Sequence, residues 1–259
     1  MRQTTRYALI MTLYLGVFSP ILAGQWETLQ KVGDFDFFSL AFISANEGFA
    51  VGSDPFDYEK PGAIGHTTNN GKTWKKVENT VFESDLKSVF FIDKNNGWAV
   101  GARGLIVATT DGGQSWEPQT SKVGNGLSDV CFLTPKTGFV AGEGETVLKT
   151  NNGGKRWTVL SGGSQASGFG DDDTSVFSAI QFVDENTGWV AGVRITPSTQ
   201  GQETLIQKTV DGGQTWVKQP TNTEDILEDI YFVNATTGWA VGENGVIFGT
   251  TDGETWKTM

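Results

Sequence analysis

The residues best placed to do chemistry are three aspartates, Asp111, Asp211 and Asp252, which recur in one short phrase, Thr-x-Asp-Gly. Carboxylates at a shared position could act as general acids, as general bases or as cation ligands. Glycine follows each of them directly, however, and aspartate before glycine is typical of tight turns in which the carboxylate accepts backbone N–H groups. A carboxylate bonded to its own turn is occupied. We therefore interpret the three aspartates as turn-stabilising rather than catalytic.

Few other side chains could do chemistry. His66 is the single histidine and Cys131 the single cysteine. A histidine that acts as a general base needs a positioned nucleophile, and none is evident for His66, so we interpret it as an ordinary side chain at a strand end. We expect Cys131 to be a small buried hydrophobe. With no clustered metal ligands and no phosphate-binding loop in the sequence, we predict no catalytic residue, no metal site and no cofactor.

The phrase that holds the aspartates ends in a tryptophan and occurs five times. The tryptophans are 42, 41, 59 and 40 residues apart, and repeats of about 40 residues indicate propeller blades or solenoid turns. Asparagine replaces aspartate in the first and third copies, and its side chain makes the same turn bonds. Each tryptophan would cover neighbouring strands with a large apolar face. The five tryptophans are Trp74, Trp116, Trp157, Trp216 and Trp256.

Short apolar segments bounded by glycine fill each repeat and predict four strands, which we call a, b, c and d in chain order. In the second repeat these are Ser88–Ile92, Gly97–Gly101, Leu105–Thr109 and Ser115–Gln119. We predict an all-β fold, a β-propeller of four-stranded antiparallel blades with five complete repeats, of WD40/YVTN-like or sialidase-like architecture. A stack of β-helical coils is the alternative. The repeats span residues 38–78, 86–119, 127–160, 175–219 and 226–259 of a single domain, residues 25–259.

The first 24 residues have the three parts of a secretory signal peptide. Arg2 and Arg6 precede an apolar stretch, Tyr7–Leu22, and a small-residue cleavage region follows at Ala23 and Gly24. We predict an exported protein, periplasmic or extracellular, with an uncleaved N-terminal anchor as the alternative. The net charge of −11 offers no basic stripe for phosphates, so we predict no nucleic-acid partner.

Variation among the repeats is confined to one set of connections. In a propeller the a–b and c–d turns emerge on one face, and the b–c and d–a connections emerge on the other. The a–b and c–d turns are nearly uniform, whereas long b–c excursions run from Ser53 to Ala63 and from Val193 to Glu203, and a long d–a connection runs from Ser161 to Thr174. Repeat folds place recognition on the variable face. The candidate partner-binding residues there are Asp54, Asp57, Tyr58, Glu59, Arg103, Glu143, Glu145, Asp171, Asp172, Asp173, Arg194 and Glu243.

Two other interpretations of these charged residues stay open. They could serve only to solubilise an exported protein. Three of them, Asp171–Asp173, could bind calcium through carboxylate oxygens. Their spacing lacks the alternating ligand order of a calcium loop, so a solvated, glycine-rich loop is favoured.

The phrase ending in tryptophan resembles the Asp-box, also called the bacterial neuraminidase repeat, whose role is structural. Together with the preceding Gly-Trp-Ala-Val-Gly strand, sharpest at Gly97–Trp116 and Gly238–Trp256, it resembles the photosystem II assembly and stability factor family. The resemblance covers essentially residues 38–259. It implies a seven-bladed lumenal or periplasmic propeller that holds a membrane-protein subunit during assembly, in the thylakoid lumen where the source is photosynthetic. It also implies partner binding through arginine, for which Arg103 is the matching position.

The alternative function is a sialidase-like glycoside hydrolase or a glycan-binding propeller, because Asp-boxes are common in sialidases. Such a hydrolase needs an arginine triad, a tyrosine nucleophile with a glutamate beside it, and an aspartate acid/base. After residue 24 the sequence has only Arg103, Arg156 and Arg194, and Arg156 lies within a c–d turn. We therefore favour a non-catalytic scaffold with a protein partner, a membrane-protein subunit by the resemblance.

The sequence allows three arrangements of the two ends of the propeller. Gln25–Val32 resembles a strand d without its blade, because Trp26 matches Trp74. This segment could latch the ring on the last blade or add a strand that covers an exposed edge. In the third arrangement, five blades form an open arc that another chain completes, which predicts oligomers. We expect a closed five-bladed ring with the N-terminal strand docked on the fifth repeat.

Overall fold

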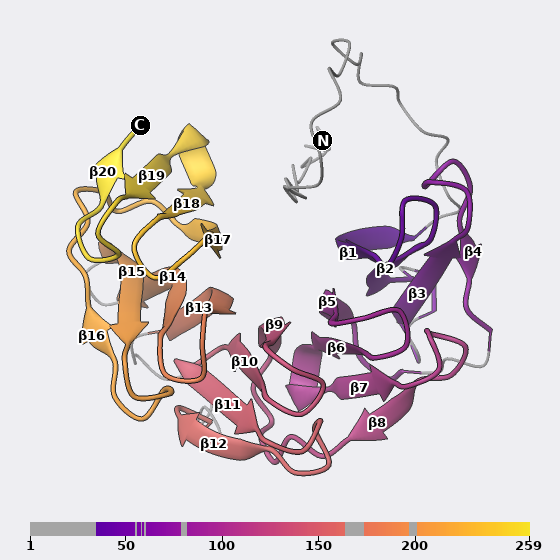
Figure 1. Cartoon of the computed structure of the whole chain (residues 1–259). Coiled ribbons are helices and arrows are strands. Elements are labelled where there is room, and N and C mark those ends of the chain that lie inside the picture. Colours follow the sequence, from indigo (N-terminus) through magenta and orange to yellow (C-terminus); the bar gives the residue numbers. More distant parts are fainter. Residues whose placement is uncertain are drawn as a thin grey trace.

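The computed structural model of the protein describes residues 35–54, 56–57, 59, 61–78, 82–163, 174–196 and 201–259. These residues form five sheets, each of four antiparallel strands in sequence order. The sheets are arranged radially as the blades of a propeller (Figure 1), which confirms the predicted fold class. The expected signal peptide and the expected extra strand, Gln25–Val32, lie outside the described residues. No helix in the described ranges is long and apolar enough to cross a membrane.

Each blade begins near the axis of the propeller and ends at its rim. The strands of blade 1 are β1 (Asp36–Phe42), β2 (Gly48–Ser53), β3 (Gly62–Thr67) and β4 (Lys75–Lys76); of blade 2, β5 (Leu86–Phe91), β6 (Gly97–Gly101), β7 (Ile106–Thr109) and β8 (Glu117–Gln119); of blade 3, β9 (Leu127–Phe132), β10 (Gly138–Gly142), β11 (Thr146–Thr150) and β12 (Thr158–Ser161); of blade 4, β13 (Thr174–Phe182), β14 (Gly188–Thr196), β15 (Gly201–Thr209) and β16 (Val217–Lys218); of blade 5, β17 (Leu227–Phe232), β18 (Gly238–Gly242), β19 (Ile247–Thr250) and β20 (Lys257–Thr258).

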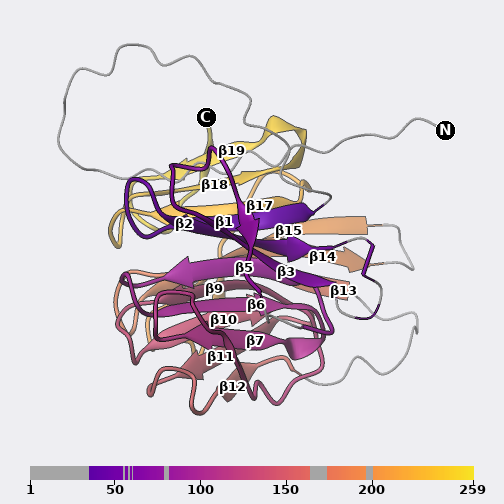
Figure 2. The same cartoon turned by 90° about the vertical axis from the view of Figure 1, so that its right-hand side faces the viewer.

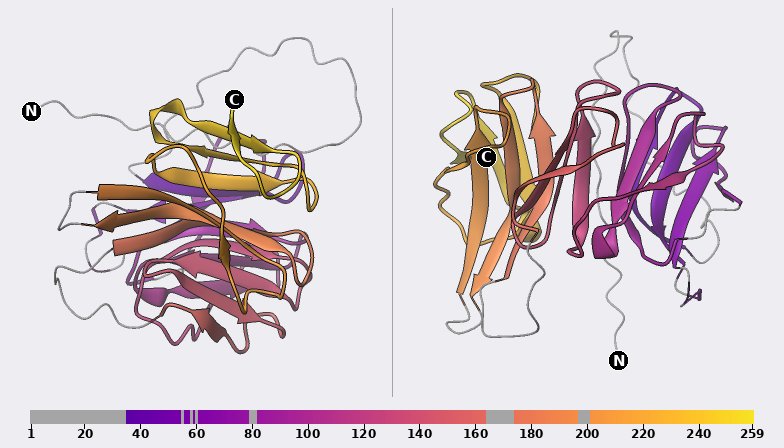
Figure 3. Two further views of the ribbon diagram at one scale, coloured as in Figure 1. Left: turned by 90° about the vertical axis from the view of Figure 1, so that its left-hand side faces the viewer. Right: turned by 90° about the horizontal axis from the view of Figure 1, so that it is seen from below.

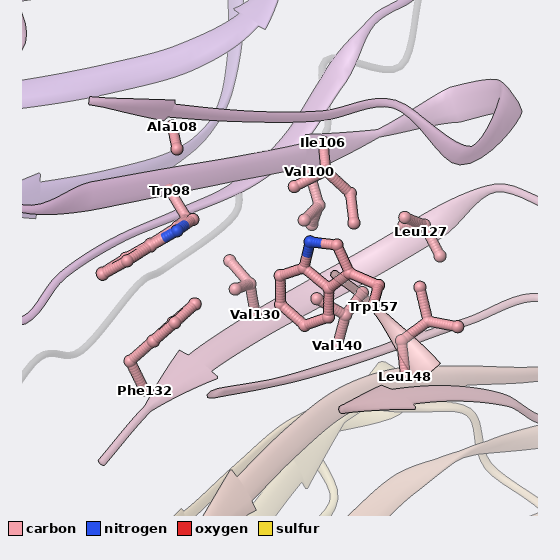
Figure 4. Close-up of a cluster of buried hydrophobic side chains, with 10 residues drawn as sticks. All are labelled: Trp98, Val100, Ile106, Ala108, Leu127, Val130, Phe132, Val140, Leu148 and Trp157. Atoms are coloured by element: carbon pink, nitrogen blue, oxygen red, sulfur yellow. The ribbon is translucent and has the colours of Figure 1, made fainter. Parts of the chain in front are cut away.

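The hydrophobic core lies between consecutive blades. At the interface of blades 2 and 3, Trp98 stacks on Phe132 with ring centroids 3.5 Å apart, and Trp157 meets the edge of the same ring at 6.0 Å (Figure 4). Trp157 is fully buried there. Aromatic pairs of this kind contribute beyond their buried area, so the repeated tryptophans and phenylalanines hold neighbouring blades together.

Glycine in strand b permits close approach of the backbone within each blade. A Cβ on Gly142 would lie 2.2 Å from the carbonyl oxygen of Gly126. The corresponding distances are 1.8 to 2.1 Å in the other four blades. Any side chain would therefore displace backbone at this position, which explains why the second glycine of the strand b phrase recurs in every repeat. The four others are Gly52, Gly101, Gly192 and Gly242.

The two faces of the propeller carry the connections that the sequence predicts. On one face the a–b and c–d turns of a blade bond to each other, as Gly112 N–H does to the carbonyl of Asn95. On the opposite face the b–c turn bonds to the segment that enters the same blade, as Glu143 N–H does to the carbonyl of Gly126. We call this second face the b–c face.

Blade 4 differs from the expected loop pattern. The segment expected as a b–c excursion from Val193 to Glu203 is mostly strand, because β14 continues to Thr196 and β15 begins at Gly201. Val193, Ile195 and Thr196 are β-branched and favour this extension. Blade 4 therefore projects past the other blades on the b–c face (Figures 2 and 3).

The described residues do not form the expected closed ring. The five blades form an open arc, with a gap between blade 1 and blade 5 (Figure 1). Closure depends on the angle between successive blades, which is set by side-chain packing and is not encoded in the strand pattern of one repeat. The expected docking of Gln25–Val32 on the fifth repeat lies outside the described residues.

Candidate functional site

The carboxylates of the repeated phrase are bonded within their own turns. Asp111 accepts the backbone N–H of Ser115 at 3.0 Å and the Ser115 hydroxyl at 2.6 Å, and Thr109 donates to the same carboxylate. These bonds, above all that from the Ser115 hydroxyl, lower the pKa of Asp111 to about 2. A carboxylate that stays ionised and bonded in this way has no proton to give at neutral pH and is a weak base.

The other two copies have the same arrangement. Bonds from Thr215 lower the pKa of Asp211 to about 2. The backbone N–H of Thr255 is the largest cause of the lowered pKa of Asp252. In the third repeat, the side-chain oxygen of Asn152 accepts the N–H of Arg156, so asparagine serves the same turn.

We expect Asp111→Ala to lower the free energy of unfolding by about 1 kcal/mol, allowing for solvent screening of this exposed group. Asp111→Asn should lose less, because asparagine already occupies the equivalent position at Asn152. The folded pKa of Asp111 is below the unfolded value of 3.8, so its contribution is present above that value and is lost as the pH falls toward 2. Urea unfolding of both variants checks this, and equal losses in the two would contradict it.

The remaining chemistry-capable side chains are engaged in packing. His66 stacks on Phe49 with ring centroids 4.5 Å apart, and its Nε2 lies 3.0 Å from Glu47 Oε1. Cys131 is a free, half-buried thiol that packs against the core between blades 3 and 4. Burial raises the pKa of this thiol well above its usual range, which leaves it unreactive.

Arg194 joins blades 3 and 4 on the b–c face. Its guanidinium donates to Glu203 Oε2 at 3.1 Å and also to Glu145, which lies in the b–c turn of blade 3. Lys218 pairs with the same Glu203. Arg194 and Glu145, two of the candidate residues, thus form one ionic network that braces the projecting hairpin of blade 4.

Other candidate residues are spread over the face. Asp54 Oδ2 accepts from Lys76 Nζ at 3.3 Å, and Asp54 Oδ1 caps the N–H of Phe56. Asp57 is half-buried and Glu59 is exposed. The remaining candidates in the long loops, Tyr58 and Asp171–Asp173, lie outside the described residues.

The last three candidates lie in the tight b–c turns of blades 2, 3 and 5. The side chain of Glu143 bonds within its own blade, because its Oε2 accepts the N–H of Gly126 at 2.9 Å. Glu243 is half-buried and begins the corresponding turn, η2 (Glu243–Gly245), of blade 5. Arg103 occupies the centre of the corresponding turn, η1 (Ala102–Gly104), of blade 2.

Arg103 has a backbone conformation that its side chain disfavours. Its φ of 57° and ψ of 31° are left-handed, which costs about 1–2 kcal/mol for a residue with a Cβ. Blade 5 has Asn244, which tolerates this region better, at the same place with φ 55°. Arg103 is exposed, and no ion pair involves it among the described residues. The turn itself requires the left-handed conformation, since both blades share it, so what distinguishes blade 2 is the choice of arginine rather than a residue that tolerates the conformation better.

The sequence interpretation missed one half-buried carboxylate that lies between the blades. Asp129, in β9, accepts the hydroxyl of Ser88 at 2.7 Å and the N–H of Ile180 at 2.9 Å, which come from the blades on either side. Burial raises its pKa to about 7, and nearby Asp229 adds to the effect. The sequence does indicate that this strand position is polar. The equivalent residues of the first three repeats are Ser39, Ser88 and Asp129.

On the b–c face, Asp54 and Glu143 accept backbone N–H groups and Glu145 pairs with Arg194. No group of three or more potential metal ligands occurs in the described ranges. Arg103 and Lys122 are exposed cations of this face, and no ion pair involves either of them among the described residues.

Comparison with known proteins identifies the repeats. Residues 69–126 and 121–222 match the family model described as "Photosynthesis system II assembly factor YCF48". The chain is 43% identical over 56 residues to the chloroplastic photosystem II stability/assembly factor HCF136 of Cyanidioschyzon merolae, a match that covers 20% of this chain and 12% of that protein. It is 53% identical over 30 residues to the photosystem II assembly protein Ycf48 of Thermosynechococcus vestitus, covering 12% and 9%. The matched segments thus span only about a tenth of these relatives.

Solved structures show the same fold. YCF48 bound to a D1 peptide is similar with a TM-score of 0.61 and 17% identity, over 89% of this chain and 72% of that one. The GH74 enzyme of Niastella koreensis is similar with a TM-score of 0.62 and 19% identity, over 86% of this chain and 38% of that one. At these identities both likenesses concern the fold alone.

Proposed function

We propose, because this chain belongs to the family of photosystem II assembly factors described as YCF48, that it is a non-catalytic scaffold that binds a protein partner on its b–c face. The observation that carries the proposal is Arg103, an exposed arginine in a disfavoured backbone conformation on that face. Blade 2 keeps an arginine, which no described residue pairs with, at a left-handed position where blade 5 has asparagine, and binding of a partner would account for this choice.

The chemistry of the partner follows from that cation. A guanidinium binds carboxylates in a bidentate manner, and such charge-assisted bonds are stronger than neutral ones. The partner would present a carboxylate from a peptide segment, and the rest of this acidic chain would disfavour acidic partners that do not dock at Arg103. The related YCF48 has been solved with a D1 peptide, so a peptide segment of a membrane-protein subunit is the partner class we propose. The working compartment is the one reached by the predicted export signal, the periplasm or the thylakoid lumen.

The test is binding of a synthetic D1 peptide, followed by calorimetry. We expect Arg103→Asn to weaken binding about tenfold to a hundredfold, as for loss of one charged hydrogen bond of about 1.5–3 kcal/mol. The same variant should be more stable than the wild type by about 1 kcal/mol, because asparagine tolerates the left-handed turn. Weaker binding together with greater stability separates a functional arginine from a structural one.

Arg156→Asn is the matched control, since Arg156 lies in a c–d turn on the opposite face and should bind the peptide as the wild type does. Absence of peptide binding by the wild type would overturn the proposed partner class. Equal losses in the two arginine variants would overturn the proposed site.

A further inference from the structure

A polar hollow lies between blades 3 and 4 on the face opposite the b–c face. Its volume is about 360 Å³, which is within the range of about 300–1,000 Å³ that is typical of small-molecule sites. Two cations and three side-chain amides line it, together with the half-buried Leu160. We call this hollow the blade 3–4 pocket. The cations are Lys149 and Arg156, and the amides are Asn151, Asn152 and Gln214.

Arg156 departs from the pattern of the repeated turn. Four of the five copies have serine or threonine directly before the tryptophan, and the third copy has Arg156 there. In the second and fourth copies this hydroxyl donates to the turn aspartate at 2.6 Å. Arg156 lacks that hydroxyl, is exposed, and forms no ion pair with any residue that the structure describes. The turn does not need the arginine, and its side chain lines the pocket instead.

Lys149 of blade 3 and Lys208 of blade 4 hold equivalent places. Each ammonium lies over the aromatic ring of strand b in its own blade, 4.9 Å from the Phe139 centroid for Lys149 and 5.4 Å from the Trp189 centroid for Lys208. Lys208 Nζ also lies 2.9 Å from Glu254 Oε1, which comes from the c–d turn of the next blade. The interface between blades 4 and 5 thus supplies a carboxylate to this lysine.

The blade 3–4 pocket has an amide where the next interface has that carboxylate. Gln214 has the place, directly before the last two residues of the phrase, that Glu254 has in the fifth copy. Lys149 Nζ donates to the carbonyl oxygen of Gly212 at 3.4 Å, and no described carboxylate pairs with it. The pocket therefore has the charge and the room for one carboxylate that the described residues do not supply.

Two acidic residues of blade 4 lie beside the pocket, and neither pairs with its cations. Asp211 accepts the hydroxyls of Thr209 and Thr215 within its own turn. Glu185 is exposed in the a–b turn, where its backbone carbonyl approaches Gly212, and its carboxylate forms no ion pair among the described residues. The ammonium and the guanidinium of the pocket are therefore both available to a bound anion.

We propose that the blade 3–4 pocket binds a small sugar acid through its carboxylate. Arg156 holds the carboxylate with its planar guanidinium, whose paired donors match the two carboxylate oxygens. Lys149 forms with it the ion pair that the equivalent lysine of the next blade forms with a glutamate. The pocket is on the face opposite the proposed partner surface, so this site is independent of the proposed function.

The amides of the pocket select hydroxyl groups beside the carboxylate. Asn152 keeps its Nδ2 as a donor, because its Oδ1 accepts the N–H of Arg156. Gln214 keeps its Oε1 as an acceptor, because its Nε2 donates to the carbonyl of Asp211 at 3.0 Å. A hydroxyl group both donates and accepts, so a ligand with several hydroxyls satisfies both amides, and Leu160 offers an apolar contact to the C–H groups of a sugar ring.

The test is an NMR titration of the protein with glucuronate, in which the backbone and side-chain amide signals are followed. We expect the signals of Asn151, Arg156 and Gln214 to shift with glucuronate until they reach a plateau. Glucose has the hydroxyl groups but no carboxylate and should leave these signals in place. Phosphate has the charge but no sugar ring and should bind more weakly than glucuronate.

Two substitutions should weaken binding for different reasons. Arg156→Thr should weaken it about tenfold to a hundredfold, as for loss of one charged hydrogen bond. The protein should stay folded, because the threonine hydroxyl can accept from Asn152 Nδ2 as the equivalent threonine does in the first copy. Gln214→Glu removes no cation but should also weaken binding, because the new carboxylate pairs with Lys149 as Glu254 pairs with its lysine in the next blade.

Lys155→Gln is the matched control, since Lys155 is an exposed cation of the same turn that does not line the pocket, and it should bind glucuronate as the wild type does. Circular dichroism checks that each variant is folded. A wild type whose signals do not shift with glucuronate would overturn the proposal. So would glucose or phosphate that binds as tightly as glucuronate, binding that survives Arg156→Thr or Gln214→Glu, or a loss in Lys155→Gln equal to that in Arg156→Thr.

Discussion

Trp157→Ala is expected to lower the free energy of unfolding by about 3–5 kcal/mol, the range for truncating a large, fully buried aromatic side chain. Trp157 is 0% exposed, meets the edge of Phe132, and donates its indole N–H to Gln119 of the preceding blade at 3.0 Å. Alanine would leave a cavity between blades 2 and 3 and would remove the donor to Gln119. Urea unfolding followed by far-UV circular dichroism measures the loss.

Trp74→Ala is the matched comparison, because Trp74 holds the same place in the repeat but borders the gap. It is partly exposed and meets the edge of Phe42 at 6.2 Å, so its loss should cost less than half as much. Equal losses at the two positions would contradict the view that packing between blades, rather than within one blade, makes the repeated tryptophan important.

The repeat made the strands, the turns and the faces predictable. Each copy has a tryptophan, glycine and a turn aspartate or asparagine at matching positions, because each copy forms the same local backbone structure. The repeat therefore predicts one blade structure for all five copies. The position of the Asp111 turn and the tight approach at Gly142 both follow from such local requirements.

The closure of the ring and the roles of the charged residues were not predictable in the same way. Arg194 is a candidate for partner binding, and its pairing with Glu145, 49 residues away, through a contact between blades could not be predicted. The angle between blades is likewise a sum of packing contacts between repeats, and a small change in each opens or closes the arc. Contacts between repeats do not change the spacing of residues within a repeat, so these features appear only in the folded structure.

Asp129 should make the stability of the protein depend on pH in a direction opposite to that of the turn aspartates. Its carboxyl bonds to Ser88 of blade 2 and to the N–H of Ile180 of blade 4, and burial raises its pKa from 3.8 to about 7. Between these two values the unfolded chain has released the proton of this carboxyl while the folded protein retains it. The free energy of unfolding therefore falls as the pH rises through this window.

The expected size of the effect follows from the width of the window. Each unit of pKa shift corresponds to about 1.4 kcal/mol, so the contribution of Asp129 should decline by up to about 4 kcal/mol between its unfolded pKa and its folded pKa near 7. The turn aspartates Asp111 and Asp211 have lowered pKa values of about 2, so their contributions change only at more acidic pH. The two windows do not overlap.

Asp129→Asn isolates this contribution, because asparagine keeps the shape of the protonated carboxyl and does not titrate. The difference in unfolding free energy between wild type and Asp129→Asn, measured by urea unfolding at a series of pH values, should favour the wild type most at the acidic end of the window and shrink toward neutral pH. Ser88→Ala is the matched variant: it keeps the carboxyl but removes a donor that lowers its pKa, so the window should extend to higher pH. A wild-type advantage that stays constant with pH would show that Asp129 is ionised in the folded protein and bridges three blades as a carboxylate.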